Sequence, residues 1–457
     1  MDFDVVVVGA GAAGCMAAKE LARFGLNVGL FDTSMRSNLG KTIIVEVERT
    51  IFGKVGVAFP TGDEAPYQNK HLRVFSSRGR EVFSLKGENP GAPIYLDRFV
   101  KRLLAEAEAA GALFFENNKA VEPIISQGRV CGAVFEEGGV RKEIKARLTI
   151  DASGFQASIV RRLDPSLGIS FIDRPQDIVS AGNAFHEIDE AKAREAIGRG
   201  LCGAEEIWVV IGNLGNYSTK YFYVSLSDLK AYILIGLKDT HKNAPQMSQI
   251  LDDFKNEQGY YGAKLYGNIA KIRISSSLDR LVTDGFMAIG EAACQVIPLH
   301  ASGVASGLYA GYLAAQTAGP VLKTGGIPST ADLWPYAMTY KRKRGADLAV
   351  FNAIRLVSES MTEDQVAGML ESGVLDRNDY YHGLIPNIAP FTLGSLPKRI
   401  YGFIKRRDLI APITKMLALA TMLKIHYAFY PSKYDPASIQ KWSRKNQKIF
   451  KSLYDRL

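Results

Sequence analysis

Residues 4–32 read DVVVVGAGAAGCMAAKELARFGLNVGLFD, and this stretch decides the fold of the N-terminal part. Residues 5–8 are consecutive valines, a β-branched run typical of a central parallel strand covered on both faces. Residues 15–23 predict a helix, and residues 27–31 predict a second buried strand. A strand, a glycine-rich turn, a helix and another strand in this order indicate a doubly wound α/β domain.

The turn between the first strand and the helix has the spacing of a dinucleotide-binding loop. In Gly9-x-Gly11-x-x-Gly14, the three glycines permit a tight turn, a close approach of the pyrophosphate and close packing of helix on strand. The helix start offers unpaired N–H groups and a positive dipole end to phosphates. Asp32 ends the second strand and can accept hydrogen bonds from ribose hydroxyls, which argues against a 2′-phosphate. At this loop we expect cofactor contacts at Gly9, Gly11, Ala13, Gly14, Asp32 and Thr33.

Three later segments favour FAD over NAD as the dinucleotide. Tyr95-Leu96-Asp97-Arg98 opens a helix in a layout that lets the arginine reach the cofactor. Residues 148–154 (LTIDASG) and 286–293 (FMAIGEAA) are buried strands that each end in an acid beside a small-residue turn. A small-residue helix over 304–318 adds a second N-terminus that favours anions. We therefore expect further cofactor contacts at Arg98, Val121, Asp151, Gly154, Gly290, Glu291 and Gly303.

With these motifs the chain resembles the FAD-dependent geranylgeranyl reductase family, which includes digeranylgeranylglycerophospholipid reductases. That family lies within the glutathione-reductase-type flavoproteins, together with aromatic hydroxylases. The wider resemblance rests on the glycine motif, the D-A-S-G strand and the late Gly-acid strand. The narrower resemblance rests on Tyr221-Phe222-Tyr223, on Ile297-Pro298-Leu299-His300 and on the tail motif YAFYP at 427–431 with Trp442 and Arg444.

The resemblance implies an α/β fold class in three parts. It implies a Rossmann-type FAD domain assembled from residues 1–44, 91–160 and 271–330. It also implies a substrate domain of the α+β type, built on an antiparallel sheet and inserted as residues 45–90 and 161–270. Residues 331–457 form a C-terminal helical region.

The resemblance also implies a reaction, the reduction of isolated C=C bonds in the isoprenoid chains of lipids or prenyl precursors. Reduced FAD donates a hydride, and a nearby acid protonates the other carbon. The chain departs from the family in two places. The family's Pro-x-Cys-Gly turn is replaced by residues 40–48 (GKTIIVEVE), and its aromatic run lacks the terminal Phe-Pro. The proton donor is therefore not defined by the resemblance.

Four residues are candidates for the acid chemistry. Glu46 and Glu48 alternate with valines, so both carboxylates lie on one face of a strand. The alternative for this pair is a solvated strand face. His300 precedes the helix at 304–318 and suits a proton relay, or else it fixes the loop through backbone hydrogen bonds. Tyr223 is a candidate proton donor or a packing residue.

Other functions fit the same motifs. A non-redox flavin-dependent cyclase or isomerase would use a glutamate to protonate an alkene. An aromatic FAD monooxygenase would consume NAD(P)H and oxygen, and a flavin-binding regulatory protein would show no turnover. No second GxGxxG occurs in the sequence. The electron donor, NAD(P)H or a protein such as ferredoxin, is therefore expected to dock transiently.

Composition excludes several classes of protein. Hydrophobic residues make up 47% of the 457 residues and charged residues 23%, as in ordinary globular proteins. The four cysteines are scattered and the six histidines form no H-E-x-x-H pattern, so we expect neither a disulfide framework nor a metal site. This cysteine usage suits a reducing cytoplasm.

The positive charge is concentrated at the C-terminal end. The net charge is +9, and residues 391–457 contain 14 Lys and Arg against 3 Asp, a local balance of +11. Such a tail suits an anionic surface, and we expect a membrane surface rather than nucleic acid, or else a solvated helical face. No run of 18 apolar residues occurs, so we expect residues 409–423 to lie in a membrane interface or in the core rather than to span a bilayer.

Overall fold

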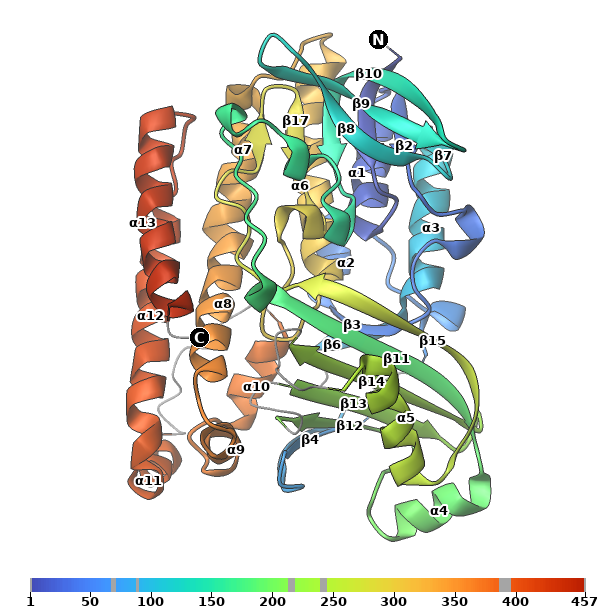
Figure 1. Cartoon of the computed structure of the whole chain (residues 1–457), viewed down its shortest axis with the longest axis vertical. Coiled ribbons are helices and arrows are strands. Elements are labelled where there is room, and N and C mark those ends of the chain that lie inside the picture. The colour runs from blue at the N-terminus through green and yellow to red at the C-terminus, as the bar shows by residue number, and fades with distance from the viewer. Residues whose placement is uncertain are drawn as a thin grey trace.

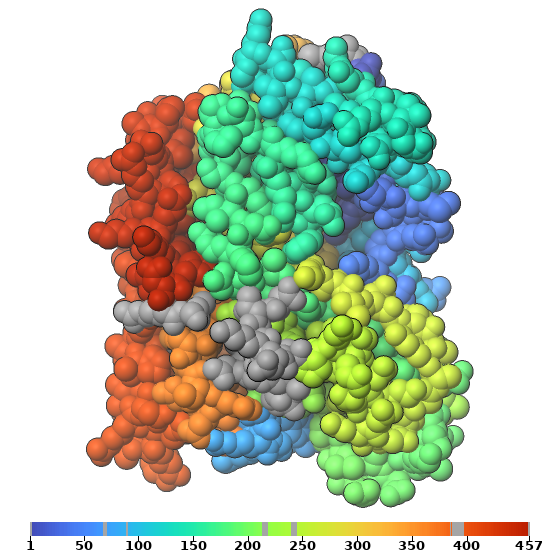
Figure 2. Space-filling model, viewed as in Figure 1, coloured from blue at the N-terminus to red at the C-terminus, as the bar shows by residue number. Residues whose placement is uncertain are grey.

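The computed structural model describes residues 2–66, 71–87, 90–212, 218–238, 245–385 and 396–455. An α/β domain forms the upper part in Figure 1, and a second sheet lies below it. The C-terminal helices run along one flank of both, as Figure 2 shows in orange and red. The predicted fold class, a Rossmann-type domain with an added sheet domain and a helical region, is confirmed.

The sheet of the upper domain has β1 at its centre, paired in parallel with β10 on one side and β2 on the other. The strand order is β16-β17-β10-β1-β2-β7, and β8 and β9 continue from β10 as an antiparallel meander. Residues 5–8 of β1 are buried, as the valine run predicts. The strands are β1 (Phe3–Val8), β2 (Val28–Phe31), β7 (Leu113–Phe115), β8 (Lys119–Ser126), β9 (Arg129–Glu137), β10 (Val140–Asp151), β16 (Val282–Thr283) and β17 (Phe286–Ala288).

Three helices pack together in this domain: α1 (Ala12–Arg23), α3 (Leu96–Ala109) and α6 (Val304–Lys323). Helix α1 starts earlier than predicted, directly after Gly11. Small residues bring α1 and α6 into close contact. A Cβ atom on Gly311 would lie 2.4 Å from the carbonyl oxygen of Ala13, so only glycine permits this packing distance.

The lower sheet has seven strands in the order β15-β11-β14-β13-β12-β4-β5, antiparallel except between β12 and β4. One face is covered by α4 (Glu190–Gly198) and α5 (Met247–Gln258). The other face meets a two-stranded sheet of β3 (Ile44–Glu48) and β6 (Gly91–Tyr95). The seven strands are β4 (His71–Ser76), β5 (Glu81–Leu85), β11 (Ile178–Ile188), β12 (Glu206–Ile211), β13 (Ser218–Ser225), β14 (Lys230–Lys238) and β15 (Tyr261–Arg273).

The C-terminal region is helical, and three of the described helices in it start with a capping box. Ser329 and Asp332 form a capping box, as do Thr362 with Gln365 and Asp376 with Asp379. The helices are α7 (Thr330–Tyr340), α8 (Ala346–Glu359), α9 (Glu363–Glu371), α10 (Arg377–Leu384), α11 (Leu396–Lys405), α12 (Ile410–Ala428) and α13 (Pro436–Tyr454), with short α2 (Thr50–Val55) completing the set of α-helices described. Among the described residues, Arg407–Ala428 alone is long and apolar enough to cross a membrane by length and composition, and 33% of its apolar window is buried.

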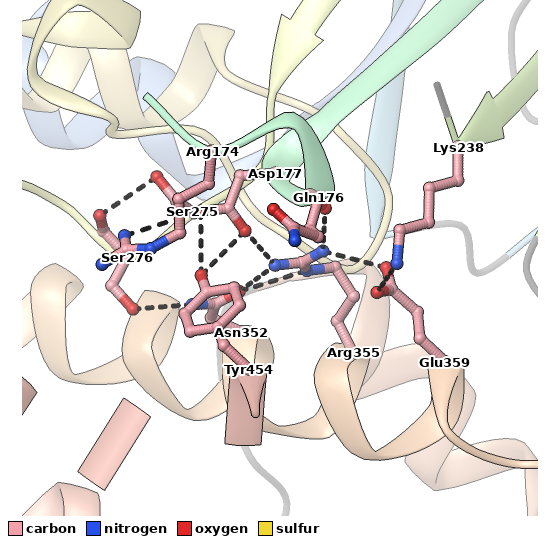
Figure 3. A network of polar contacts seen from close by, with 10 residues as sticks. All are labelled: Arg174, Gln176, Asp177, Lys238, Ser275, Ser276, Asn352, Arg355, Glu359 and Tyr454. Atoms are coloured by element: carbon pink, nitrogen blue, oxygen red, sulfur yellow. Dashed lines mark hydrogen bonds and ion pairs between the residues drawn. The ribbon is translucent and has the colours of Figure 1, made fainter. Parts of the chain in front are cut away.

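A buried polar network ties the helical region to the lower sheet (Figure 3). Arg355 of α8 donates to Asp177 at 2.6 Å and to Glu359 at 2.9 Å. Tyr454, at the end of α13, donates its hydroxyl to the same Asp177, and Lys238 of β14 pairs with Glu359 at 2.5 Å. The two acids and two bases are buried together, so their charges compensate.

The boundaries of the three parts of the chain, as the resemblance implies them, stay a prediction.

Candidate functional site

The glycine loop of the upper domain has the shape of a phosphate cradle. Gly9 has φ +101°, and a Cβ atom there would lie 2.4 Å from the carbonyl oxygen of Ala152. A Cβ on Gly14 would lie 1.8 Å from the carbonyl oxygen of Gly9, whereas a Cβ on Gly11 would meet nothing within 4 Å. Packing of the fold therefore explains Gly9 and Gly14 but not Gly11. The open space beside Gly11 fits a group that approaches the backbone, as a pyrophosphate does.

Asp32 holds this loop in place. Its carboxylate accepts hydrogen bonds from the backbone N–H of Ala10 and of Ser34, each at 2.7 Å. Asp32 thus joins the end of β2 to the glycine turn and sets the edge where a ribose would lie. Thr33 is exposed beside it, and Val121 lies at a register shift of β8. These positions are compatible with the predicted cofactor contacts, which stay predictions.

Asp151 has a different surrounding from Asp32. It is buried, and its carboxylate accepts hydrogen bonds from Ser153 N–H, Ser153 Oγ–H, Ile159 N–H and Val160 N–H at 2.6–3.0 Å. These bonds use its oxygens to shape the loop that begins at Ala152. We therefore assign the Asp151 side chain to fixing the loop, which leaves Gly154, with φ +65° and open space around it, as the residue there that a cofactor can approach.

The turn at Gly290 and Glu291 lies against the glycine loop that follows β1. Gly290 has φ +64°, and a Cβ there would lie 3.0 Å from the Cβ of Ala13. Glu291 accepts the backbone N–H of Arg273 at 2.9 Å, and burial raises the pKa of its carboxyl. Gly303 precedes α6 without a side-chain cap, so the N-terminus of α6 keeps N–H groups for an anion or a carbonyl.

A small pocket lies where the segment after β2 passes the start of α3. It has a volume of about 310 Å³ and is lined by Lys41, Thr42, Asp97, Lys101 and Asn268, among others. One carboxylate oxygen of Asp97 is buried without a hydrogen-bond partner among the described residues. Arg98 next to it is exposed and donates to the carbonyl oxygen of Asp63 at 2.5 Å. These side chains are of the kind that hydrogen-bond hydroxyl groups, and the predicted contact of Arg98 with FAD stays a prediction.

Glu46 lies where the upper domain meets the lower sheet. Its backbone carbonyl accepts the hydroxyl of Ser302 at 3.1 Å, from the loop before α6. Its carboxylate lies 3.4 Å from the hydroxyl of Tyr221, which belongs to β13 of the lower sheet. Because β3 is fixed to both domains, the Glu46 carboxylate faces the aromatic side of the sheet beside the start of α6.

Strand β3 and the residue Thr42 just before it are held over the lower sheet by three of its side chains. Asn183 of β11 and Asn268 of β15 both donate to the carbonyl oxygen of Thr42, at 3.1 and 3.3 Å. Tyr232 of β14 donates to the carbonyl oxygen of Ile44 at 3.3 Å. These contacts fix the backbone that carries Glu46 against the lower sheet.

Comparisons with known proteins agree with this geometry. Residues 2–227 match the model of the FAD binding domain family. Two observations therefore support an FAD site: this family match and the open space beside Gly11 in the glycine loop.

The chain is an FAD-dependent oxidoreductase.

Two curated relatives extend the match beyond that domain. The digeranylgeranylglycerophospholipid reductase of Sulfolobus acidocaldarius is 22% identical over 97% of this oxidoreductase and 96% of its own length. A second such reductase, from Methanothermobacter thermautotrophicus, is 24% identical over 81% of this chain and 92% of its own. These matches confirm the resemblance to the geranylgeranyl reductase family that the motifs indicated.

Solved structures show the same fold. A geranylgeranyl bacteriochlorophyll reductase-like protein from Thermoplasma acidophilum superimposes with a TM-score of 0.70, 18% identity, and coverage of 89% of this chain and 99% of its own. A myxobacterial FAD-dependent halogenase gives a TM-score of 0.58 at 17% identity, over 94% of this chain and 97% of its own.

The structure separates Glu48 from Glu46, although both lie on β3. Glu48 accepts Arg344 Nη1 at 2.6 Å and the hydroxyl of Thr50 at 2.8 Å. Burial opposes ionisation of Glu48, but Arg344, Thr50 and Lys54 lower its pKa. An acid held as the carboxylate in an ion pair is a poor proton donor, so we assign Glu48 to anchoring β3 on the helical region.

The surroundings of His300 and of Tyr223 shift the pKa of both residues. Desolvation by surrounding protein lowers the pKa of His300 to about 4, although part of the residue remains exposed, so the imidazole is neutral at pH 7. Tyr223 donates its hydroxyl to Glu205 at 2.5 Å, and burial together with that carboxylate raises its pKa.

Sequence reasoning missed two tyrosines near Glu46. Tyr221 was noted only as part of the aromatic run, and its alternation with Tyr223 on one strand face was the available signal. Tyr380 of α10 was not singled out. Burial and the nearby charge of Glu46 raise the pKa of Tyr380, and no local motif links these residues, which are more than 300 positions apart in the sequence.

Proposed function

We propose that this oxidoreductase reduces isolated C=C bonds in the isoprenoid chains of lipids or prenyl precursors. The observation that carries the proposal is the position of Glu46, whose carboxylate lies beside an apolar layer at the junction of the two domains. The names of the two curated relatives support the same substrate class.

The apolar layer is suited to a hydrocarbon chain. It covers the face of the lower sheet that meets β3, and its aromatic members stack on one another; Phe185, for example, packs against Tyr232 with ring centroids 4.4 Å apart. A chain without polar groups gains affinity there by leaving water. The aromatic residues of this layer are Phe83, Tyr95, Phe185, Tyr221, Tyr223, Tyr232, Tyr380 and Tyr381.

Glu46 is the proposed proton donor to the alkene. FAD, when bound and reduced, supplies the hydride for one carbon of the double bond. Glu46 holds the proton for the other carbon on a carboxylate oxygen, and Tyr221 orients that carboxylate. His300 lies just before α6, and its imidazole is neutral at pH 7.

The electron donor is proposed to dock transiently, as NAD(P)H or as a protein such as ferredoxin. A single GxGxxG motif in the chain, already assigned to FAD, supports this assignment.

The protein is further proposed to act as a peripheral protein on an anionic membrane surface facing the cytoplasm. Helices α11 and α12 support this, since Ile404 is 60% exposed, Ile425 56% and Phe429 77%. Large apolar side chains at 410, 417, 422 and 425 follow one face of α12, and the basic cluster Lys405-Arg406-Arg407 stands at its start. An apolar face beside cations is the pattern of an interfacial helix.

Vesicle sedimentation tests the membrane assignment. The double variant I425S/F429S is expected to lose most of its binding to vesicles containing phosphatidylglycerol, while the exposed control V140S, in the upper domain, binds as the unaltered protein does. Equal binding to purely neutral phosphatidylcholine vesicles would contradict the role of the basic cluster.

Mass spectrometry tests the reaction itself. Prenyl lipids incubated anaerobically with the protein and dithionite are expected to gain hydrogens in pairs. Fully reduced flavin with lipids of unchanged mass would overturn the proposal. An isomer of equal mass would establish the cyclase alternative, and an aromatic substrate that gains oxygen under air would establish the monooxygenase.

A further inference from the structure

A groove of about 670 Å³ lies between the edge strand β5 and helices α9 and α11. These helices stand at the lower end of the helical flank in Figure 1. None of the residues discussed for FAD lines the groove, and Glu46 and Tyr221 do not line it either. Its lining includes five basic side chains, two acidic side chains and an apolar wall of Val82, Phe83, Leu370, Leu375 and Tyr401.

The two acids of the groove are already neutralised. Glu81 accepts Arg73 Nη2 at 2.5 Å. Glu371 accepts the Ser76 hydroxyl at 2.5 Å and lies 3.6 Å from Arg78. Arg73, Arg78 and Ser76 do not line the groove, so these contacts satisfy the acids without using a groove cation.

Three groove cations are left over. Of the five, Arg406 pairs with Asp364 and Asp408, and Arg377 also has an interaction partner. Arg80, Lys398 and Lys405 form no ion pair among the residues that the structure describes, and all three are exposed. Lys405 lies over the ring of Tyr401, 4.4 Å from its centroid. The groove therefore carries an excess of positive charge next to an apolar wall, which is the complement of an anion attached to a hydrocarbon.

The apolar wall continues toward Glu46. Phe83 and Leu370 belong to the same packed layer as Tyr221 and Tyr232. The ring of Phe83 stacks on Tyr380 with centroids 5.4 Å apart. The charge of Glu46 in turn contributes to the raised pKa of Tyr380, so the ring that stacks on Phe83 of the groove lies within electrostatic range of the proposed proton donor.

We propose that this groove binds a phosphate-bearing head group of the substrate, with Arg80, Lys398 and Lys405 as its ligands and the attached chain directed along Phe83 and Tyr380. The inference rests on the proposed function and adds a specificity-determining site to it. The anion is a phosphate ester or diphosphate, carried either by a soluble prenyl precursor or by a membrane lipid.

Direct binding separates this inference from the reaction. Calorimetry with the FAD-loaded protein compares geranylgeranyl diphosphate with geranylgeraniol, which has the same chain and no charge. We expect K398E/K405E to weaken diphosphate binding by about tenfold or more and to leave the alcohol unchanged. K398R/K405R is expected to retain binding. K441E/K448E, with the same charge change at exposed positions of α13, is the matched control.

The outcomes distinguish the two proposals. Diphosphate binding unaffected by K398E/K405E, or an equal loss for the alcohol, would overturn the groove as a head-group site. Inorganic pyrophosphate that binds as tightly as the prenyl diphosphate would also overturn it, since the attached chain would then play no part. Binding that follows the expected pattern without any reduction of double bonds would uphold the groove and refute the proposed reaction. A prenyl phospholipid in vesicles, reduced with a KM that K398E/K405E raises at unchanged kcat, would identify the lipid as the source.

Discussion

The hydroxyl oxygen of Tyr221 lies 3.4 Å from a carboxylate oxygen of Glu46. The two residues come from different sheets, and the carbonyl oxygen of Glu46 is bound by Ser302 of the FAD domain. A carboxyl group held in this way can deliver a proton from a defined position.

Replacing Glu46 by Gln should therefore slow the chemical step. We expect kcat for alkene reduction to fall by about 10²–10⁴-fold, the usual contribution of a general acid. FAD content and the rate of flavin reduction should not change. Tyr221→Phe should give a smaller loss, because it removes only the orienting hydroxyl.

Glu48→Gln is the control on the same strand. It breaks the contact with Arg344 and should lower the free energy of unfolding, while the chemical step in the folded protein is retained. A loss of kcat equal to that of Glu46→Gln would contradict the separation of the two acids.

Two glycine substitutions test the cofactor cradle. Gly11→Ala should leave the stability of the apoprotein unchanged, since its Cβ meets nothing within 4 Å. It should weaken FAD binding by roughly tenfold, because a methyl group that clashes with the pyrophosphate costs about 1–3 kcal/mol. Gly14→Ala should destabilise the apoprotein itself, since its Cβ would lie 1.8 Å from a carbonyl oxygen. Flavin absorbance after gel filtration and thermal unfolding of apoprotein measure the two effects, and unchanged FAD affinity in Gly11→Ala would place the pyrophosphate elsewhere.

Arg355 should be among the most sensitive positions for stability. Arg355→Met leaves Asp177 and Glu359 buried without their shared cation (Figure 3) and should lower the free energy of unfolding by about 3–5 kcal/mol. Arg194→Met removes an exposed pair with Glu190 on α4 and should cost about 0.3–0.5 kcal/mol. Urea unfolding compares the two variants. Similar losses would show that the network in Figure 3 adds nothing to a surface pair.

His426 should make stability depend on pH. It is buried against Trp442, with ring centroids 4.5 Å apart, and desolvation lowers its pKa to about 4. The unfolded chain binds a proton near pH 6.5 and the folded chain does not, so this group destabilises the fold as the pH falls from about 6.5 toward 4. At pH 5 the loss should be about 2 kcal/mol relative to pH 7.5, and His426→Phe should remove it. The same pH slope in His426→Phe would assign the effect to other groups.

The sequence predicted the parts of the fold that depend on local patterns. The valine run, the glycine spacing and Asp32 lie within about 30 residues, so their structure follows from one strand-turn-helix unit. The late turn at Gly290 was also recognisable from its buried strand.

The contacts around Glu46 depend instead on long-range pairing. The Ser302 hydroxyl and Tyr221 are 256 and 175 residues from Glu46, and the groove joins strand β5 to helix α11. The ion pair of Glu48 with Arg344 shows the same limitation. Alternation placed both glutamates on one face, but only tertiary packing decides that one meets a tyrosine and the other a guanidinium.

The contacts of strand β3 with both domains matter for the design of chimeras between this protein and its relatives. From the lower sheet, Tyr232 binds the carbonyl of the first residue of β3, and Asn183 and Asn268 bind the carbonyl of Thr42 just before the strand. Ser302 of the upper domain binds the carbonyl of Glu46. A chimera that exchanges only the seven-stranded sheet would replace the side chains that hold this segment, and Glu46 would then be displaced. An active chimera therefore has to take β3 together with its contact residues from both domains, because neither domain alone fixes the position of Glu46.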